Sequence, residues 1–112
     1  WGKITLYNVD AIRLIQSFNT PSFIFLDPPY VGKGERLYEY FYRTQDHAEL
    51  CNAVIQYLHL QPWIITYDNC ELIRGLYKQY LINEYEISYS VAGPAAAKEI
   101  VITNIPSNRF CW

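Results

Sequence analysis

The residues best suited to chemistry are four in succession, Asp27-Pro28-Pro29-Tyr30, which follow the apolar run of residues 22–26. Neither proline carries a backbone N–H, and both restrict the chain to an extended conformation. The segment therefore presents a carboxylate and a neighbouring carbonyl oxygen as two fixed acceptors, with an aromatic ring beside them. A planar NH2 group on a flat ring matches this arrangement, and the exocyclic amine of a nucleobase rotated out of its helix is such a group.

The loop that follows this tetrapeptide combines basic and aromatic side chains within a short span. They include Lys33, Arg36, Tyr38, Tyr40 and Phe41. Basic residues attract phosphates and aromatic rings stack on bases, so we predict that this loop contacts a nucleic acid. Ordinary solvated charges are the alternative for each basic residue taken alone.

Three short apolar runs have the composition of strands, at residues 3–9, 22–26 and 63–67. The second and third have the pattern of strands buried in a parallel sheet. An acidic residue follows each run: Asp10, Asp27 and Asp68. Because ligands of parallel α/β sheets bind outside the carboxyl ends of the strands, we expect these carboxylates to share one rim. Asp10 and Asp68 have an alternative role as N-caps of the helices that follow them.

Helical patterns of apolar residues separate these strands. The first helix is expected over residues 10–18. The second is predicted to begin at Asp46 and the third at Asp68, because Glu49 and Glu71 stand three residues later, which is capping-box spacing.

The C-terminal part changes to a period of two residues, at 85–91 and 99–103, which predicts an antiparallel hairpin. A chain of 112 residues is enough for one modest core. We therefore predict a single α/β domain whose sheet is mostly parallel and ends in a C-terminal antiparallel hairpin. Trp63 and Tyr67 are expected in its core, and His47 is expected on a helix surface without a catalytic role.

Composition restricts the class of protein. The formal net charge is -2, so any nucleic-acid binding must come from local basic residues. No apolar run is long enough to cross a bilayer, and we expect no membrane contact. The three cysteines are widely spaced, which fits free thiols in a reducing cytoplasm rather than disulfides or a zinc site. The sequence lacks methionine and begins with Trp1, so we expect a piece of a longer protein or a processed one.

The tetrapeptide after its apolar strand resembles motif IV of the amino-methyltransferases that use S-adenosylmethionine, and the Asp form is typical of adenine-N6 DNA methyltransferases. Three further segments are similar to parts of the Dam-like enzymes of this group, "LYEYFYRTQDHAEL", "WIITYDN" and "KEIVITN". The resemblance covers most of residues 4–104. It implies a Rossmann-like S-adenosylmethionine-dependent methyltransferase sheet with an antiparallel strand pair at one edge.

This resemblance implies a role for each residue of the motif. Asp27 and the carbonyl of Pro28 would accept hydrogen bonds from the amine of a flipped adenine in duplex DNA, and Tyr30 would stack on the base. Pro29 completes the rigid motif. Asp10 and Asp27 would contact the cofactor, S-adenosylmethionine. The methyl group would pass from the sulfonium to the amine without a metal, by positioning and electrostatics.

In these enzymes a glycine-rich "FxGxG"-type cofactor motif and a target-recognition segment precede the tetrapeptide, and neither occurs in this sequence. We therefore expect residues 1–112 to be the C-terminal catalytic portion of a methyltransferase domain, inactive alone and prone to self-association. The residues also leave two other functions open. One is an RNA or rRNA adenine-N6 methyltransferase, and the other is a non-catalytic binding module that keeps the fold.

Overall fold

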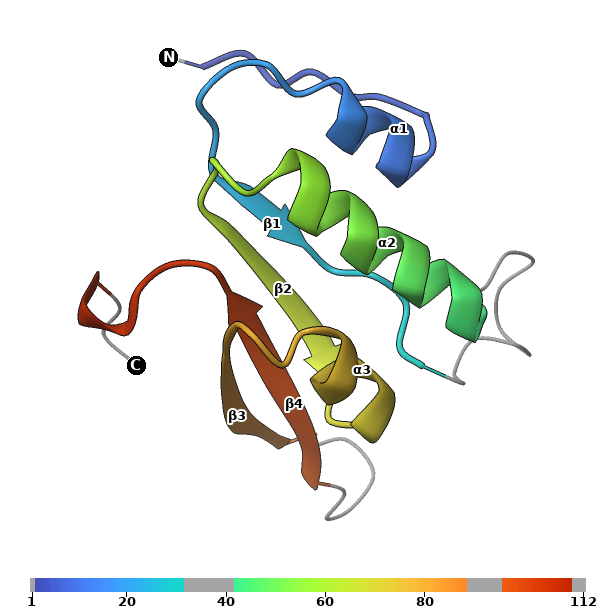
Figure 1. Cartoon of the computed structure of the whole chain (residues 1–112), viewed down its shortest axis with the longest axis vertical. Helices are drawn as coiled ribbons and strands as arrows, with labels where there is room; N and C mark the ends of the chain where they lie inside the picture. Colours follow the sequence, from blue (N-terminus) through green and yellow to red (C-terminus); the bar gives the residue numbers. More distant parts are fainter. Residues whose placement is uncertain (1, 32–41, 89–95, 110–112) are drawn as a thin grey trace.

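The sheet of this protein has four strands in the order β1-β2-β4-β3 (Figure 1). The computed structural model describes residues 2–31, 42–88 and 96–109. The strands are β1 (Ile24–Leu26), β2 (Trp63–Asp68), β3 (Leu81–Ser88) and β4 (Ala96–Thr103). The helices are α1 (Ala11–Gln16), α2 (Thr44–Tyr57), α3 (Glu71–Leu76) and the short 3-10 helix η1 (Ser107–Arg109). Together they form a mixed α/β unit, as the sequence predicts.

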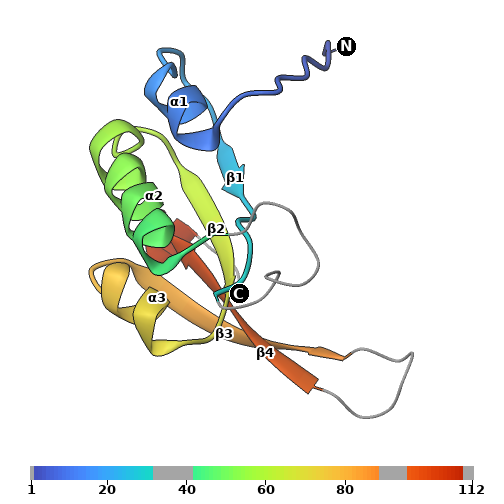
Figure 2. The same cartoon turned by 90° about the vertical axis from the view of Figure 1, so that its right-hand side faces the viewer.

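The strand pairings are of two kinds. β1 runs parallel to β2, whereas β4 runs antiparallel to both β2 and β3. The described strands therefore confirm the C-terminal hairpin but not the mostly parallel sheet. The difference arises because β4, the second strand of the hairpin, lies between β2 and β3 and brings antiparallel pairing to the centre of the sheet. Figure 2 shows the three α-helices on one side of this sheet.

Residues 3–9 form no strand, so that prediction is wrong. Their apolar side chains are exposed, with Ile4 at 89% and Leu6 at 90% of full accessibility. A strand is stabilised by the ladder to its neighbour and by packing of one face. Within the described sheet no strand pairs with this segment. Apolar composition alone therefore does not make it a strand.

The helix starts agree with the sequence in one case and differ in another. α1 begins after Asp10, whose Oδ2 accepts a hydrogen bond from the backbone N of Arg13 at 3.3 Å, so the predicted cap is confirmed. α2 begins at Thr44, before the predicted start at Asp46. Asp46 lies in its first turn, where Oδ2 accepts from the backbone N of Arg43 at 2.7 Å. α2 has 14 residues, and no helix within the described ranges is long and apolar enough to cross a bilayer.

The core is formed mainly by α2, β2 and β4. Its fully buried side chains include Val54, Leu58, Trp63, Ile65, Tyr67, Ile100 and Ile102. Trp63 and Tyr67 are therefore in the core, as predicted. His47 is also fully buried, so its predicted surface position is wrong. It lies three and seven residues before Leu50 and Val54, which places it on the inward stripe of α2.

Candidate active site

Asp27 is the first residue after β1, and its side chain is exposed. Leu26 of β1 pairs with Ile65 of β2, so Asp27 lies level with Thr66. Thr66 Oγ1 donates a hydrogen bond to Asp27 Oδ1 at 2.9 Å. No described residue donates to Oδ2. The carboxylate therefore has one oxygen fixed by the sheet and one oxygen open to a ligand.

The two prolines end the pairing of β1 with its neighbour. Pro28 and Pro29 are half-buried, and no described backbone N–H donates to their carbonyl oxygens. Neither residue has a hydrogen-bond donor of its own. The carbonyl of Pro28 is therefore available as a second acceptor directly after Asp27. Residues 27–30 are termed the DPPY segment below.

Asp68 fixes the chain just beyond the DPPY segment. Its Oδ1 accepts a hydrogen bond from the backbone N of Val31 at 3.1 Å. Asp68 is the last residue of β2, and Cys70 is the N-cap of α3, so the predicted capping role of Asp68 is wrong. Because β1 and β2 are parallel, Asp27 and Asp68 do lie at the same edge of the sheet, as predicted.

The hydroxyl group of Tyr30 reaches β4, which lies beyond β2 in the sheet. This hydroxyl donates a hydrogen bond to Glu99 Oε1, a carboxylate of β4. Tyr85 of β3 donates to the second oxygen, Oε2, at 2.8 Å. Glu99 is only 5% exposed, so its carboxylate is surrounded almost entirely by protein groups instead of water.

Three side chains of the sheet thus hold the DPPY segment and its exit: Thr66, Asp68 and Glu99, which we term the bracing residues. Thr66 and Asp68 are two residues apart on β2 and share a face, and Glu99 lies opposite Asp68 on β4. Neither Thr66 nor Glu99 is among the site residues that the sequence predicts. Two signals were available: Thr66 and Asp68 alternate with buried residues, and Glu99 is an acidic residue beside an apolar run.

The opposite face of β2 is anchored to α2 by a buried polar contact. His47 Nδ1 lies 2.8 Å from the hydroxyl of Tyr67, which stands between Thr66 and Asp68 on the strand. Burial lowers the pKa of His47, and nearby carboxylates, Asp68 foremost, oppose that effect. Burial raises the pKa of the Tyr67 hydroxyl strongly, so this residue stays neutral. The contact between neutral His47 and Tyr67 therefore holds β2 from the helix side, and the other face of β2 carries Thr66 and Asp68.

Asp10 does not follow a strand, because residues 3–9 form none. It lines a hollow of about 280 Å³ together with Ile12, Tyr42, Asp46 and Glu49. Burial, with smaller contributions from the carboxylates of Asp10 and Asp46, raises the pKa of Tyr42. No described contact joins Asp10 to Asp27 or Asp68. Asp27 and Asp68 are therefore the two carboxylates that the parallel strands β1 and β2 bring to their carboxyl ends.

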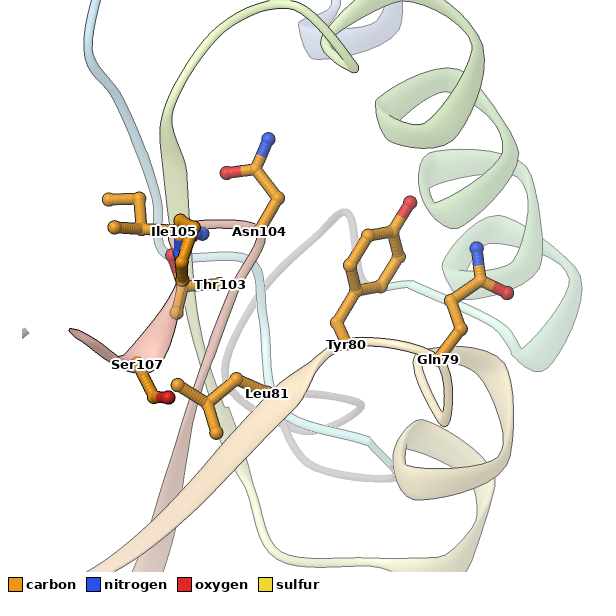
Figure 3. A pocket seen from close by; sticks show the side chains of 8 residues that line it. Gln79, Tyr80, Leu81, Thr103, Asn104, Ile105 and Ser107 are labelled. Carbon is orange, nitrogen blue, oxygen red and sulfur yellow. The ribbon is translucent and has the colours of Figure 1, made fainter. Parts of the chain in front are cut away.

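A further hollow lies at the opposite end of the strands. It has a volume of about 360 Å³ and is lined from the start of β3 and the end of β4 (Figure 3). Asn104 on its wall is used by the fold: its Oδ1 accepts from the backbone N of Trp63 at 2.9 Å, and its Nδ2 donates to the carbonyl of Gln61 at 2.7 Å. This hollow is thus separate from the DPPY segment, since Trp63 begins β2 and Asp68 ends it.

The remaining predicted site residues lie outside the described residues. They are Lys33, Arg36, Tyr38, Tyr40 and Phe41, and their contacts with nucleic acid stay a prediction. Within the part of the chain that the structure describes, no cluster of His, Cys, Asp or Glu could hold a metal ion.

The fold and the site define a mixed α/β protein with two acceptors and an aromatic ring at the carboxyl edge of parallel strands. Residues 2–91 match the family of D12 class N6 adenine-specific DNA methyltransferases, and the chain belongs to this family. The matched range contains the DPPY segment, and the match confirms the resemblance stated from the sequence. No curated protein matches the chain.

Proposed function

We propose that the DPPY segment holds the exocyclic amine of an adenine rotated out of duplex DNA, for methylation at N6. The observation that carries this proposal is the state of the Asp27 carboxylate, which is exposed, fixed at Oδ1 by Thr66 and open at Oδ2. The amine has two hydrogens. One is accepted by Asp27 and the other by the carbonyl of Pro28, which has no described donor.

This pair of acceptors also prepares the amine for reaction. In free adenine the lone pair of N6 is conjugated with the ring and is a poor nucleophile. With both hydrogens directed at fixed acceptors, the lone pair turns out of conjugation and attacks. When bound, S-adenosylmethionine supplies an electrophilic methyl group on its sulfonium. Methyl transfer would join the methyl carbon to the amine nitrogen and leave the electron pair of the C–S bond on sulfur. Asp27, which holds the amine, or water would accept the proton.

The chain offers acidic groups suited to part of this cofactor. The ammonium and the ribose hydroxyls of the cofactor can donate hydrogen bonds to carboxylates, and its sulfonium is attracted to them by charge. Asp27 and Asp10 are exposed carboxylates of this kind, and we propose that they contribute to its binding. Asp10 keeps a structural duty as well, because it caps α1.

Base binding and DNA binding are assigned to other residues. Tyr30 is half-buried next to the acceptors, and its ring is proposed to stack on the flipped base. The basic and aromatic side chains of residues 33–41 are proposed to contact phosphates and neighbouring bases. The family match favours DNA over RNA as the nucleic acid.

Substitution of Asp27 in the full-length protein tests this function. Asp27→Ala should lower methyl transfer to an adenine-containing duplex by at least about 10²-fold, the scale of losing one preorganised polar group. Asp27→Asn keeps one acceptor oxygen and should retain more activity than Asp27→Ala. Glu86→Gln, which removes an exposed carboxylate on β3, is the matched control and should leave turnover unchanged. Near-normal turnover by Asp27→Ala would refute the proposed function.

A further inference from the structure

A buried carboxylate on β4 stands out among apolar neighbours. Glu99 precedes Ile100, which is fully buried, and is itself 5% exposed. A carboxylate in such a place is strongly unfavourable unless its oxygens accept hydrogen bonds. Both oxygens do so, one from the hydroxyl of Tyr30 and the other from that of Tyr85. Glu99 is thus held by two phenol groups from opposite sides.

These two phenols come from different parts of the fold. Tyr85 is the direct partner of Glu99 in the β3–β4 ladder, so that contact is internal to the hairpin. Tyr30 is 69 residues away in sequence and belongs to the DPPY segment. The contact between Tyr30 and Glu99 therefore spans β2 and connects the candidate active site to the hairpin. Asp68, opposite Glu99 on β2, holds the residue after Tyr30 in the same way.

The attachment point on the ring has a chemical consequence. A tyrosine bonded through its hydroxyl is fixed at both ends, at Cβ and at the phenol oxygen, and its ring faces are not used by the anchor. A ring fixed in this way loses less side-chain entropy when a base stacks on it. On the basis of the proposed function, we infer that Glu99 is a positioning residue that presents the ring of Tyr30 to the flipped base.

A purely structural role for Glu99 makes a different prediction, and Tyr85 separates the two. Tyr85→Phe removes one donor from the same carboxylate but leaves the contact with Tyr30 in place. If Glu99 only stabilises the hairpin, its substitution should resemble Tyr85→Phe. If Glu99 positions the ring, its substitution should resemble Tyr30→Phe, which removes the hydroxyl and keeps the ring.

The test measures base flipping and DNA affinity in the full-length protein, with the fluorescence of 2-aminopurine at the target position as the probe. Glu99→Ala and Tyr30→Phe should each reduce the flipped fraction and raise KM for DNA by about tenfold, the scale of one hydrogen bond to a charged group. The double variant should lose no more than either single one, because both remove the same contact. Glu99→Gln keeps an acceptor oxygen and should recover part of the effect, and Tyr85→Phe should leave flipping unchanged.

Two outcomes overturn the inference. One is a Glu99→Ala protein that has a lower Tm but normal flipping and normal KM, as for Tyr85→Phe. The other is a Tyr30→Phe protein that flips as well as the wild type; this variant decides the question should Glu99→Ala fail to fold. Failure of the proposed function is distinguishable, because it appears as activity of Asp27→Ala whatever Glu99 does. Inactive Asp27→Ala combined with silent Glu99 variants refutes only the positioning role.

Discussion

At the scale of single residues, the orientation of the Asp27 carboxylate depends on a side chain of the neighbouring strand. A carboxylate at the end of a strand is free to rotate, and Thr66 removes that freedom by donating to Oδ1. The hydroxyl reaches Asp27 because β1 and β2 are in register at Leu26 and Ile65. The orientation of the Asp27 carboxylate therefore comes from a neighbouring strand and not from the DPPY segment alone.

Thr66→Val should weaken the reaction without unfolding the protein. Valine has nearly the shape of threonine but no hydroxyl, so Asp27 would lose its one described donor. We expect kcat/KM to fall by about tenfold, the scale of a hydrogen bond to a charged group, with little change in Tm. Thr66→Ser keeps the hydroxyl and serves as the matched control. Equal activity of the valine and serine variants would show that Thr66 does not orient Asp27.

His47 should make stability depend on pH on the acidic side. Burial lowers the pKa of His47 in the folded protein, whereas a histidine in the unfolded chain has a pKa of about 6.5. Stability is therefore full above that pH and declines as the pH falls from there towards the lower folded pKa, with a slope of at most about 1.4 kcal/mol per pH unit. Urea unfolding from about pH 8 down to about pH 5 measures this slope. His47→Gln should reduce the slope and exposed His59→Gln should not; an unchanged slope in His47→Gln contradicts the assignment.

At the scale of elements, the sequence predicts most strands but few of the contacts between them. The runs at 22–26 and 63–67 and the C-terminal hairpin are predictable because burial and alternation leave local patterns. The segment 3–9 has a strand composition yet no partner, so a local pattern misleads there. The contact of Tyr30 with Glu99 depends on the strand order, which places β4 beside β2, and no local pattern encodes that order.

Helix α3 offers a test at this scale. Gly75 lies inside the helix, and a Cβ atom added to it would meet no atom within 4 Å other than those of its chain neighbours and of the helix's own backbone. Gly75→Ala should therefore stabilise the protein by about 0.5–1 kcal/mol, since alanine restricts the unfolded chain and favours the helix. Thermal or urea unfolding measures the change. A loss of stability in Gly75→Ala would show that α3 is not a regular helix at this position.

At the scale of the whole molecule, one strand edge of the described sheet is open and carries exposed apolar side chains. In the described sheet β1 pairs only with β2, so its other edge is open. Phe25 on β1 is 60% exposed, and Phe23 beside it is 59% exposed. In the N-terminal segment, Ile4 and Leu6 are exposed as well. An open, apolar strand edge is a template for pairing with another chain.

We predict that the 112-residue chain associates through this edge and does not methylate DNA alone. Size-exclusion chromatography with light scattering should show dimers or larger species. Phe25→Lys should shift them towards the monomer, because a lysine on an edge strand opposes pairing. Leu60→Lys is the control, since Leu60 is 83% exposed but lies in the loop that connects α2 to β2. A stable monomer that transfers methyl groups would contradict both parts of this prediction.

Identification of the methylated base decides whether the DPPY segment directs methylation to adenine N6. The full-length protein is incubated with S-adenosylmethionine and either duplex DNA or RNA. The product is digested to nucleosides, which are separated by chromatography and identified by mass spectrometry. We predict N6-methyladenine in the DNA, little or none in the RNA, and a yield at least about 10²-fold lower with Asp27→Ala. A methyl group on cytosine, a preference for RNA, or an equal yield from Asp27→Ala would contradict the account.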